Sequence, residues 1–204
     1  MAHQVDVHQE TRNLDKYERG QGIEARLLAR FRRRLEAEVT ALSPSSLLDA
    51  GCGEGVVTAW LADALPGAQI TGADGRDDAL EDLRRRSPRV RAVHADLYDL
   101  PFADGEFDVV VSTEVLEHLE RPRDAVRELA RVARTHVVVT VPHEPFFRGG
   151  NLARGRYVGR LGSTPGHLNT WGRRGLVGLL RPEVESVRWF SVFPWQAAVA
   201  PVRA

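Results

Sequence analysis

The sequence predicts an α/β fold built on a doubly wound sheet, and three observations lead to that prediction. Residues 47–55, LLDAGCGEG, pass from an apolar run through an acid to glycines at alternate positions, which is typical of a strand ending in a tight ligand-binding turn. Residues 107–112, FDVVVS, form a continuous apolar run of the kind that parallel sheets bury on both faces. Strand-like and helix-like segments alternate along the chain, which indicates parallel strands joined by right-handed crossovers.

Turn residues and periodicity indicate where each element begins and ends. Residues 22–42 carry apolar side chains at helical spacing and stop before Ser43-Pro44, so they predict an amphipathic helix against the sheet. Pro122 suits a helix start, where no amide hydrogen is needed, and Thr170 is expected to cap a last helix that Pro182 ends. The remaining helices are expected at 58–65, 78–86, 122–133 and 171–180, and the strands from 47 and at 69–73, 90–94, 107–112, 136–141, 187–194 and 195–202.

The composition fits one compact domain, because 204 residues can bury a sizeable core and 43% hydrophobic content is ordinary. The amino terminus is polar and no apolar run is long enough to cross a bilayer, so a cytoplasmic protein without a membrane span is expected. The 28 basic and 28 acidic residues balance, which argues against a nucleic-acid partner. Cys52 is the single cysteine, and within a glycine loop it is expected to be a small loop residue rather than a nucleophile.

The glycine turn discriminates between two nucleotide cofactors. In the dinucleotide fingerprint GxGxxG the third glycine follows the second by three residues, but Val56 stands at that position. Asp49 lies two residues before Gly51, where a carboxylate repels a pyrophosphate but suits a ligand that carries an ammonium and a sulfonium. S-adenosylmethionine is therefore favoured over NAD, although the glycines alone fit an ordinary tight turn equally well.

Acids recur at the ends of successive predicted strands. Asp74 follows the second strand, roughly 20 residues after the glycines, where an acid can accept hydrogen bonds from ribose hydroxyls. Asp96 follows the third strand and could accept from an adenine amino group, and Thr113 and Glu114 follow the fourth. Because ligands of such sheets bind beyond the carboxyl ends of the strands, these residues and the glycine loop are expected to line one crevice.

These motifs resemble the class I S-adenosylmethionine-dependent methyltransferases, of the small-molecule type (methyltransferase type 11/12-like). The resemblance implies a Rossmann-like, seven-stranded sheet that is mostly parallel, with one antiparallel strand in a carboxyl-terminal hairpin and helices on both faces. It spans about half of the chain in the family's order. The matching motifs are LLDAGCGEG at 47–55, GAD at 72–74, HADLYDLPFADGEFDVVVSTEVLEHL at 94–119 and HVVVTVPHEP at 136–145.

The resemblance also implies S-adenosylmethionine as cofactor and a set of contacts to it. Tyr17, ahead of the first helix, would fold over the methionine end of the cofactor, with a frayed terminus as the alternative. The expected cofactor-binding residues are Tyr17, Asp49, Gly51, Cys52, Gly53, Asp74, Gly75, Arg76, Asp96, Leu97, Thr113 and Glu114.

Residues 143–170 break the alternation and are rich in glycine, arginine and aromatic residues. A segment of this length without periodicity is usually a functional loop, so it is expected to be a substrate lid. Its arginines suit an anionic acceptor such as a phosphate or carboxylate, whereas a solvated loop packed on the core is the alternative. The chain is accordingly divided into a helical segment (1–43), a cofactor-binding core (44–142), the lid (143–170) and a carboxyl-terminal helix and hairpin (171–204).

Histidines near the expected crevice are the candidate bases. His143 follows the fifth strand and His167 lies in the lid, so these two are expected to be catalytic if the acceptor must lose a proton. His118 is expected to cap or pack within its own helix. Trp171 and Trp195 are expected to belong to the core rather than to a pocket wall.

The sequence limits the possible substrates mainly by excluding some classes of methyltransferase. The Asn-Pro-Pro-Tyr type of tetrad used on nucleic-acid bases is absent, since Ser112-Thr113-Glu114-Val115 stands in its place, and the tandem acids that hold a metal in catechol-type enzymes are not recognisable. We therefore expect a metal-free methyltransferase, a monomer or homodimer, that methylates oxygen on a small molecule of natural-product or cell-envelope and lipid metabolism. The alternatives are a non-catalytic S-adenosylmethionine-binding regulator or partner subunit and, less favoured, an NAD-dependent oxidoreductase.

Overall fold

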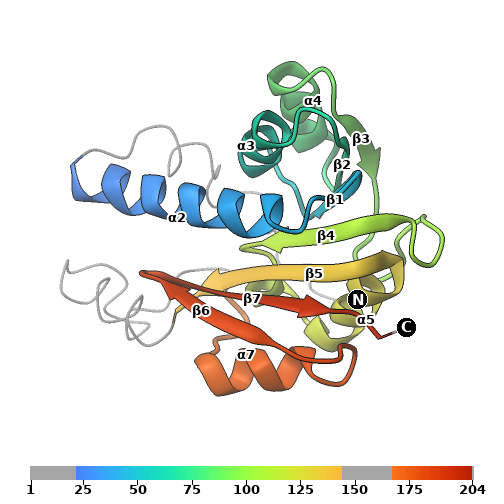
Figure 1. Cartoon of the computed structure of the whole chain (residues 1–204). Coiled ribbons are helices and arrows are strands. Elements are labelled where there is room, and N and C mark those ends of the chain that lie inside the picture. Colours follow the sequence, from blue (N-terminus) through green and yellow to red (C-terminus); the bar gives the residue numbers. More distant parts are fainter. Residues whose placement is uncertain (1–21, 144–166, 204) are drawn as a thin grey trace, which may run out of the picture.

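The computed structural model describes residues 22–143 and 167–203, which form one sheet of seven strands with helices on both faces (Figure 1). The strands lie in the order β3-β2-β1-β4-β5-β7-β6. Their bounds are β1 Ser46–Ala50, β2 Gln69–Asp74, β3 Arg91–His94, β4 Phe107–Thr113, β5 Ala133–Pro142, β6 Arg188–Val192 and β7 Trp195–Pro201. The helices are α2 Ile23–Thr40, α3 Val56–Ala64, α4 Asp77–Arg86, α5 Pro122–Val132 and α7 Arg173–Leu180, with a short 3₁₀ turn, η2, at Leu116–His118.

The pairing of the strands confirms the predicted sheet. β1 pairs in parallel with both β2 and β4, and β4 pairs in parallel with β5. β7 runs antiparallel to β5 and to β6, so it is the antiparallel member of the carboxyl-terminal hairpin. The chain moves outward in one direction from β1 to β3 and then returns to add β4 on the other side of β1. The carboxyl ends of β1 and β4 therefore flank the point where the strand order reverses, which is where ligands bind in sheets of this kind.

Alternate residues of the central strands feed two separate cores. Leu47 of β1 packs in the cluster formed with α2, α3 and α4, whereas the next residue, Leu48, packs in the cluster formed with α5 and α7. Figure 1 shows these two groups of helices on opposite sides of the sheet. β4 is buried on both faces, which explains why its sequence is a continuous apolar run rather than an alternating one.

Two helix starts differ from the sequence prediction by two residues, and two others differ by one. α3 begins at Val56 rather than at residue 58, directly after Gly55, whose left-handed backbone conformation ends the glycine turn. α7 begins at Arg173 behind an extended Gly172, and no side chain caps it, so the prediction that Thr170 caps this helix is wrong. Residue 170 lies outside the helix because the chain there is still bound to the segment after β4, as described below.

The two tryptophans that are expected to belong to the core are buried to different extents. Trp195 is 4% exposed, and its ring centroid lies 4.7 Å from that of Phe31 on α2. Trp171 is partly buried against the α5 and α7 cluster. The prediction that Trp195 belongs to the core is confirmed, whereas Trp171 packs at the edge of the core and also lines a pocket between α5 and α7.

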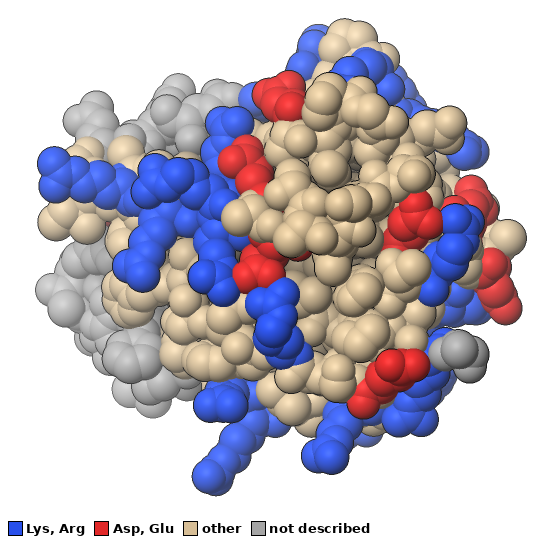
Figure 2. Space-filling view, viewed as in Figure 1, with Lys and Arg blue, Asp and Glu red and all other residues tan. Residues whose placement is uncertain are grey.

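The arginines of α2 lie mostly on its solvent side, where Figure 2 shows basic side chains gathered along this helix. Arg32 and Arg34 form ion pairs with Glu36 and Glu38 one turn further on, at 2.7 Å in each case. Such exposed pairs contribute little to stability, so this cluster is a solvated helix face. Within the described ranges, none of the helices combines the length and apolarity that crossing a bilayer requires.

Candidate functional site

The glycine turn between β1 and α3 is tied to the end of the neighbouring strand β2. The backbone amides of Gly51 and Cys52 both donate to the carbonyl oxygen of Ala73, at 2.8 and 3.0 Å. The turn is closed by a further bond from the Gly55 amide to the Cys52 carbonyl at 3.0 Å. These bonds hold the turn over the carboxyl ends of β1 and β2.

The three glycines of the turn have different physical reasons to be glycine. All have positive φ, but a Cβ on Gly51 would lie 2.5 Å from a methyl carbon of Val115, and one on Gly55 would lie 2.4 Å from a methyl carbon of Leu83. A Cβ on Gly53 would meet no described heavy atom within 4 Å. We expected all three glycines to admit a ligand to the backbone. The structure instead assigns two of them to close packing with other parts of the chain and leaves Gly53 facing open space.

Asp74 lies directly beside this open position. Its carboxylate accepts from the Gly53 amide at 2.8 Å and from its own near neighbour, the Arg76 amide, at 3.0 Å. The Arg76 guanidinium donates to Glu54 at 3.1 Å and lies 3.8 Å from Asp74. Arg76, an expected cofactor contact, therefore holds Asp74 and the turn in place. Glu54 is 4% exposed and is the structural partner of Arg76. The sequence did not predict this pair, because Arg76 lies in the turn that follows the next strand, β2.

Asp49 is buried beneath the turn at the end of β1. Its Oδ2 accepts from the Thr58 hydroxyl at 2.6 Å, and its Oδ1 has no hydrogen-bond partner in the described part of the chain. Burial raises the pKa of Asp49 to about 6, the charge of Asp74 adds to the increase, and the Thr58 hydrogen bond opposes it. Near neutral pH, two carboxylates therefore make the turn electronegative, which favours a cationic ligand.

Cys52 is a buried part of the turn. Burial and the nearby carboxylates of Asp49 and Asp74 raise the pKa of its thiol above the ordinary value. A neutral thiol is a poor nucleophile, so its position fits the expected role of a small loop residue.

The residues after β2 and β3 form the rim of the crevice. The amide of Ala95 donates to the Asp74 carbonyl at 3.1 Å, which places the start of the segment after β3 beside Asp74. Asp96 is exposed and accepts from the Tyr98 amide at 2.9 Å, whereas Leu97 packs against the core. A Cβ on Gly75 would meet the Ala95 carbonyl at an ordinary 3.6 Å, so space does not require glycine there. Tyr17 lies outside the described residues.

The end of β4 supplies the opposite wall of the crevice. Thr113 is 8% exposed and is paired with Thr140 of β5. Glu114 follows with a φ of 57°, and its amide donates to the Thr140 carbonyl at 3.0 Å. A non-glycine residue held at positive φ stores strain and is found preferentially at functional sites. Both residues thus lie where the sequence placed them, at the carboxyl end of the fourth strand.

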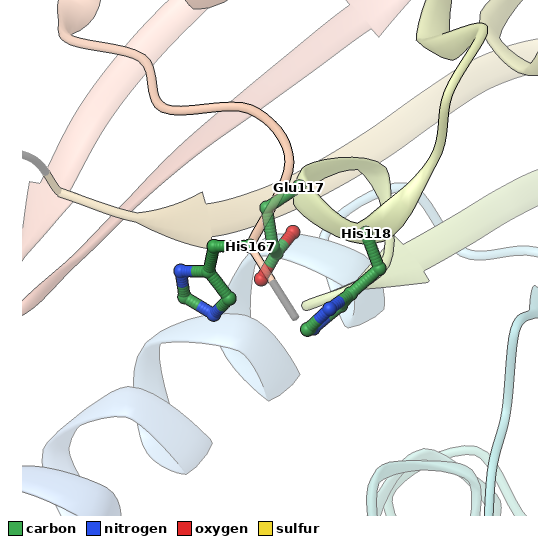
Figure 3. Close-up of side chains that lie close together, drawn as sticks. All are labelled: Glu117, His118 and His167. Carbon is green, nitrogen blue, oxygen red and sulfur yellow. The ribbon is translucent and has the colours of Figure 1, made fainter. Parts of the chain in front are cut away.

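The two expected bases lie in different surroundings. The His143 amide donates to the Pro194 carbonyl at 2.9 Å, and its ring centroid lies 6.0 Å from that of Trp189, so it is held against the carboxyl-terminal hairpin. The ring of His167 instead packs edge to face on that of His118, with centroids 4.9 Å apart. Figure 3 shows the rings of His118 and His167 and the side chain of Glu117 directed toward a common space.

The expectation for His118 is wrong. It lies in η2 and is exposed, and its ring contacts a residue of the segment before α7 instead of packing within a helix. Glu117, His118 and His167 form a cluster that the sequence did not predict. His167 lies about fifty positions after the other two residues, and only the fold brings the three together.

Comparison with known proteins decides the family. Residues 48–140, which run from within β1 into β5, match a family model described as a methyltransferase domain. Together with the strand order and the acidic glycine turn, this match identifies the fold and the cofactor class. Residues 48–140 therefore form a class I S-adenosylmethionine-dependent methyltransferase domain.

Curated relatives of this methyltransferase match over part of their length. It is 37% identical over 120 residues to a probable S-adenosylmethionine-dependent methyltransferase of Mycobacterium tuberculosis, covering 58% of this chain and 42% of that one. It is 34% identical over 125 residues to a malonyl-acyl-carrier-protein O-methyltransferase of Legionella pneumophila, covering 60% and 43%. The chain thus spans less than half the length of these relatives.

A solved structure resembles this methyltransferase over most of the chain. Magnesium protoporphyrin IX methyltransferase from Synechocystis PCC 6803, solved with S-adenosylhomocysteine bound, has a TM-score of 0.68 at 17% identity and covers 94% of each chain. This likeness concerns the fold.

The residues of the turn fit the cofactor of the family. S-adenosylmethionine carries an ammonium, a sulfonium and two ribose hydroxyls. The open space at Gly53 admits a ligand to the backbone, Asp74 lies beside that space with a carboxylate, and Asp49 beneath it has an oxygen without a described partner. These features match the charge and the hydrogen-bond donors of S-adenosylmethionine.

Proposed function

We propose that this methyltransferase transfers a methyl group from S-adenosylmethionine to an oxygen of a small-molecule acceptor. The observation that carries the proposal is the open backbone at Gly53 with Asp74 beside it and the buried Asp49 beneath it. A pyrophosphate would meet two carboxylates at this turn, so NAD is disfavoured.

The bound cofactor supplies a methyl group activated by an adjacent positive sulfur. The protein's own contribution is then alignment of the acceptor and, where the acceptor is protonated, removal of its proton. Asp74 would hold the ribose, and the field of Asp49 would favour the cationic end. Thr113 and Glu114 at the end of β4 would flank the acceptor side of the crevice.

His167 is the base that this arrangement favours. It lies next to η2, which follows the end of β4 by a few residues, whereas the described contacts of His143 join it to the hairpin. His143 remains the second candidate. Residues 143–170 are proposed as the acceptor cover; the described residues at its two ends lie at the end of β5 and beside η2.

The class of acceptor is inferred from the charged residues of the sequence and from the relatives, and not from the fold. Arg148, Arg154, Arg156 and Arg160 lie outside the described residues, but their number within one segment with a single acid favours an anionic acceptor. The relatives have different named acceptors, which include a malonyl group on acyl carrier protein and demethylmenaquinone. Natural-product or cell-envelope and lipid metabolism would supply such molecules.

The test is to incubate the purified protein with S-adenosylmethionine and a panel of hydroxylated and carboxylated small molecules, and to measure release of S-adenosylhomocysteine by mass spectrometry. Release that requires one class of acceptor supports the proposal. Tight cofactor binding without release on any acceptor would favour the regulator or partner subunit instead, and reduction of NAD by any compound would overturn the proposal.

His167→Ala separates cofactor binding from transfer in the same assay. Because His167 contacts η2 and not the glycine turn, its loss should leave the affinity for S-adenosylhomocysteine unchanged while turnover falls by about 10²-fold or more, the usual contribution of a positioned base. Unchanged turnover would remove His167 from the catalytic residues.

A further inference from the structure

We propose that Glu117, His118 and His167 bind one divalent transition-metal ion, with Zn²⁺ as the representative ion. Each side chain offers one ligand atom, and these atoms all lie within 4.8 Å of one another. Two imidazole nitrogens and one carboxylate oxygen are a donor set that first-row divalent ions favour. This ion site is separate from methyl transfer, and it departs from the expectation of a metal-free protein.

The fold holds the two parts of this cluster together through the backbone. The amides of Leu168 and Asn169 both donate to the carbonyl oxygen of Glu117, at 2.8 and 3.0 Å. The Asn169 side-chain amide donates to the Leu119 carbonyl at 2.6 Å. These three bonds hold Leu168 and Asn169 against η2 and the residue that follows it. The position of His167 beside His118 is therefore set by main-chain contacts and does not depend on the two rings alone.

The three side chains of the cluster differ in how far they are exposed to solvent. Glu117 is 1% exposed, His167 is half-buried and His118 is exposed. An ionised carboxylate is costly to bury unless a cation or hydrogen bonds compensate for lost water. A metal ion beside Glu117 would stabilise its buried charge further, and the exposed ring of His118 leaves an entry path for the ion from solvent.

The geometry is close to that of a bound ion. Ligand atoms of a tetrahedral zinc site with bonds of about 2.0 Å lie about 3.3 Å apart, so side-chain movements of roughly 1.5 Å or less would close the cluster. Exposed His118 can make most of that movement by rotating its ring. Three protein ligands would leave a fourth position open, which is the arrangement of zinc sites that bind a further molecule and not of purely structural ones.

The experiment is a calorimetric titration of chelator-treated protein, free of any histidine tag, with Zn²⁺, followed by the visible absorption of the Co²⁺-loaded protein. We expect one ion per chain and a Co²⁺ spectrum of low coordination number. His118→Asn and His167→Asn should each weaken Zn²⁺ binding by at least about 100-fold, because loss of a direct ligand costs no less than loss of its supporting contacts.

His94→Asn is the matched control. His94 is also exposed and its ring lies 2.9 Å from the Asp77 carboxylate, so it tests whether any surface histidine beside an acid suffices. This variant should bind Zn²⁺ as the wild type does. Glu117→Gln removes the buried ligand, but its folding must be checked by circular dichroism; the two histidine variants test the site without it.

The site is refuted if the wild type binds no Zn²⁺ at one ion per chain, or if both histidine variants bind it as tightly as the wild type. A His167 ring that is bonded to the ion cannot also accept a proton, so His167 acts as the proposed base only in the ion-free protein. Turnover is therefore not used as the readout, because loss of His167 would lower it in either case. Titration of the same samples with S-adenosylhomocysteine reports on the proposed function separately, since that ligand is expected at the glycine turn.

Discussion

The cofactor side and the acceptor side of the crevice are built in different ways. On the cofactor side, the residues of the site come from two neighbouring strands and the turns that follow them. Hydrogen bonds of 2.8–3.0 Å join the glycine turn and the Arg76 amide to the end of β2. Asp49 is held separately by the Thr58 hydroxyl. On the acceptor side, η2 after β4 is joined to residues 167–169, which follow β5 only after a long intervening segment. A ligand site whose residues follow two neighbouring strands can be predicted from the spacing of motifs in the sequence. A site formed by two segments that are distant in the sequence can be recognised only once the fold is known.

The largest expected effect is on folding and comes from Gly55→Ala. The added Cβ would lie 2.4 Å from Leu83 Cδ1 and 3.1 Å from its Cα, at a φ of 76°. Overpacking and backbone strain together should lower the free energy of unfolding by about 2–5 kcal/mol. Urea denaturation measures this loss.

Gly178→Ala is the control for that substitution. Gly178 lies within α7, and its Cβ would meet no described atom within 4 Å, so alanine should stabilise the helix by about 0.5–1 kcal/mol. If Gly55→Ala were as well tolerated as Gly178→Ala, the assignment of Gly55 to packing would be wrong.

The next effect is on cofactor binding. Asp74→Ala removes a carboxylate that lies beside the open position of Gly53, so the affinity for S-adenosylhomocysteine should fall by about 1.5–3 kcal/mol, the usual value for hydrogen bonds to a charged group. Calorimetry measures the change, with Asp77→Ala, an exposed acid three residues further on, as the control that should bind normally. Unchanged affinity in Asp74→Ala would remove this residue from the site.

Asp49→Asn tests the buried charge beneath the turn through its pH dependence. The pKa of Asp49 is raised from 3.8 to about 6 in the folded protein, so the folded state holds this proton more tightly than the unfolded chain. Ionisation of Asp49 therefore costs stability, and the cost develops as the pH rises from about 4 to about 6 and is then constant.

Asparagine keeps the acceptor for the Thr58 hydroxyl and removes the charge. Relative to wild type, the variant should gain about 3 kcal/mol of unfolding free energy between the acidic and the neutral end of that range. Urea denaturation at several pH values measures the gain. A difference that does not vary with pH would show that Asp49 is not the buried titrating group described above.

The smallest effect is expected on the acceptor side. Asn169→Ala removes the hydrogen bond to the Leu119 carbonyl, which should lower the free energy of unfolding by about 0.5–1.5 kcal/mol. The affinity for S-adenosylhomocysteine should not change, because the bond lies away from the glycine turn. A fall in that affinity would mean that the two sides of the crevice are coupled and would break the comparison.

Much of the fold and of the cofactor side could be predicted from the sequence because the relevant signals are local. The buried run of β4 and the acid at the end of each of the first strands are visible in the chain order. The separate reasons for Gly51 and Gly55 could not be predicted, because they depend on Val115 and Leu83, which only the packed structure brings near. The contact between His118 and His167 is hidden for the same reason.

The central claim is that the open, electronegative glycine turn binds S-adenosylmethionine and not a dinucleotide. The most direct test is calorimetric titration of the wild-type protein with S-adenosylhomocysteine and, separately, with NAD. We expect one molecule of S-adenosylhomocysteine to bind per chain in the micromolar range and NAD not to bind. Binding of NAD, or failure of S-adenosylhomocysteine to bind to folded protein, would contradict it.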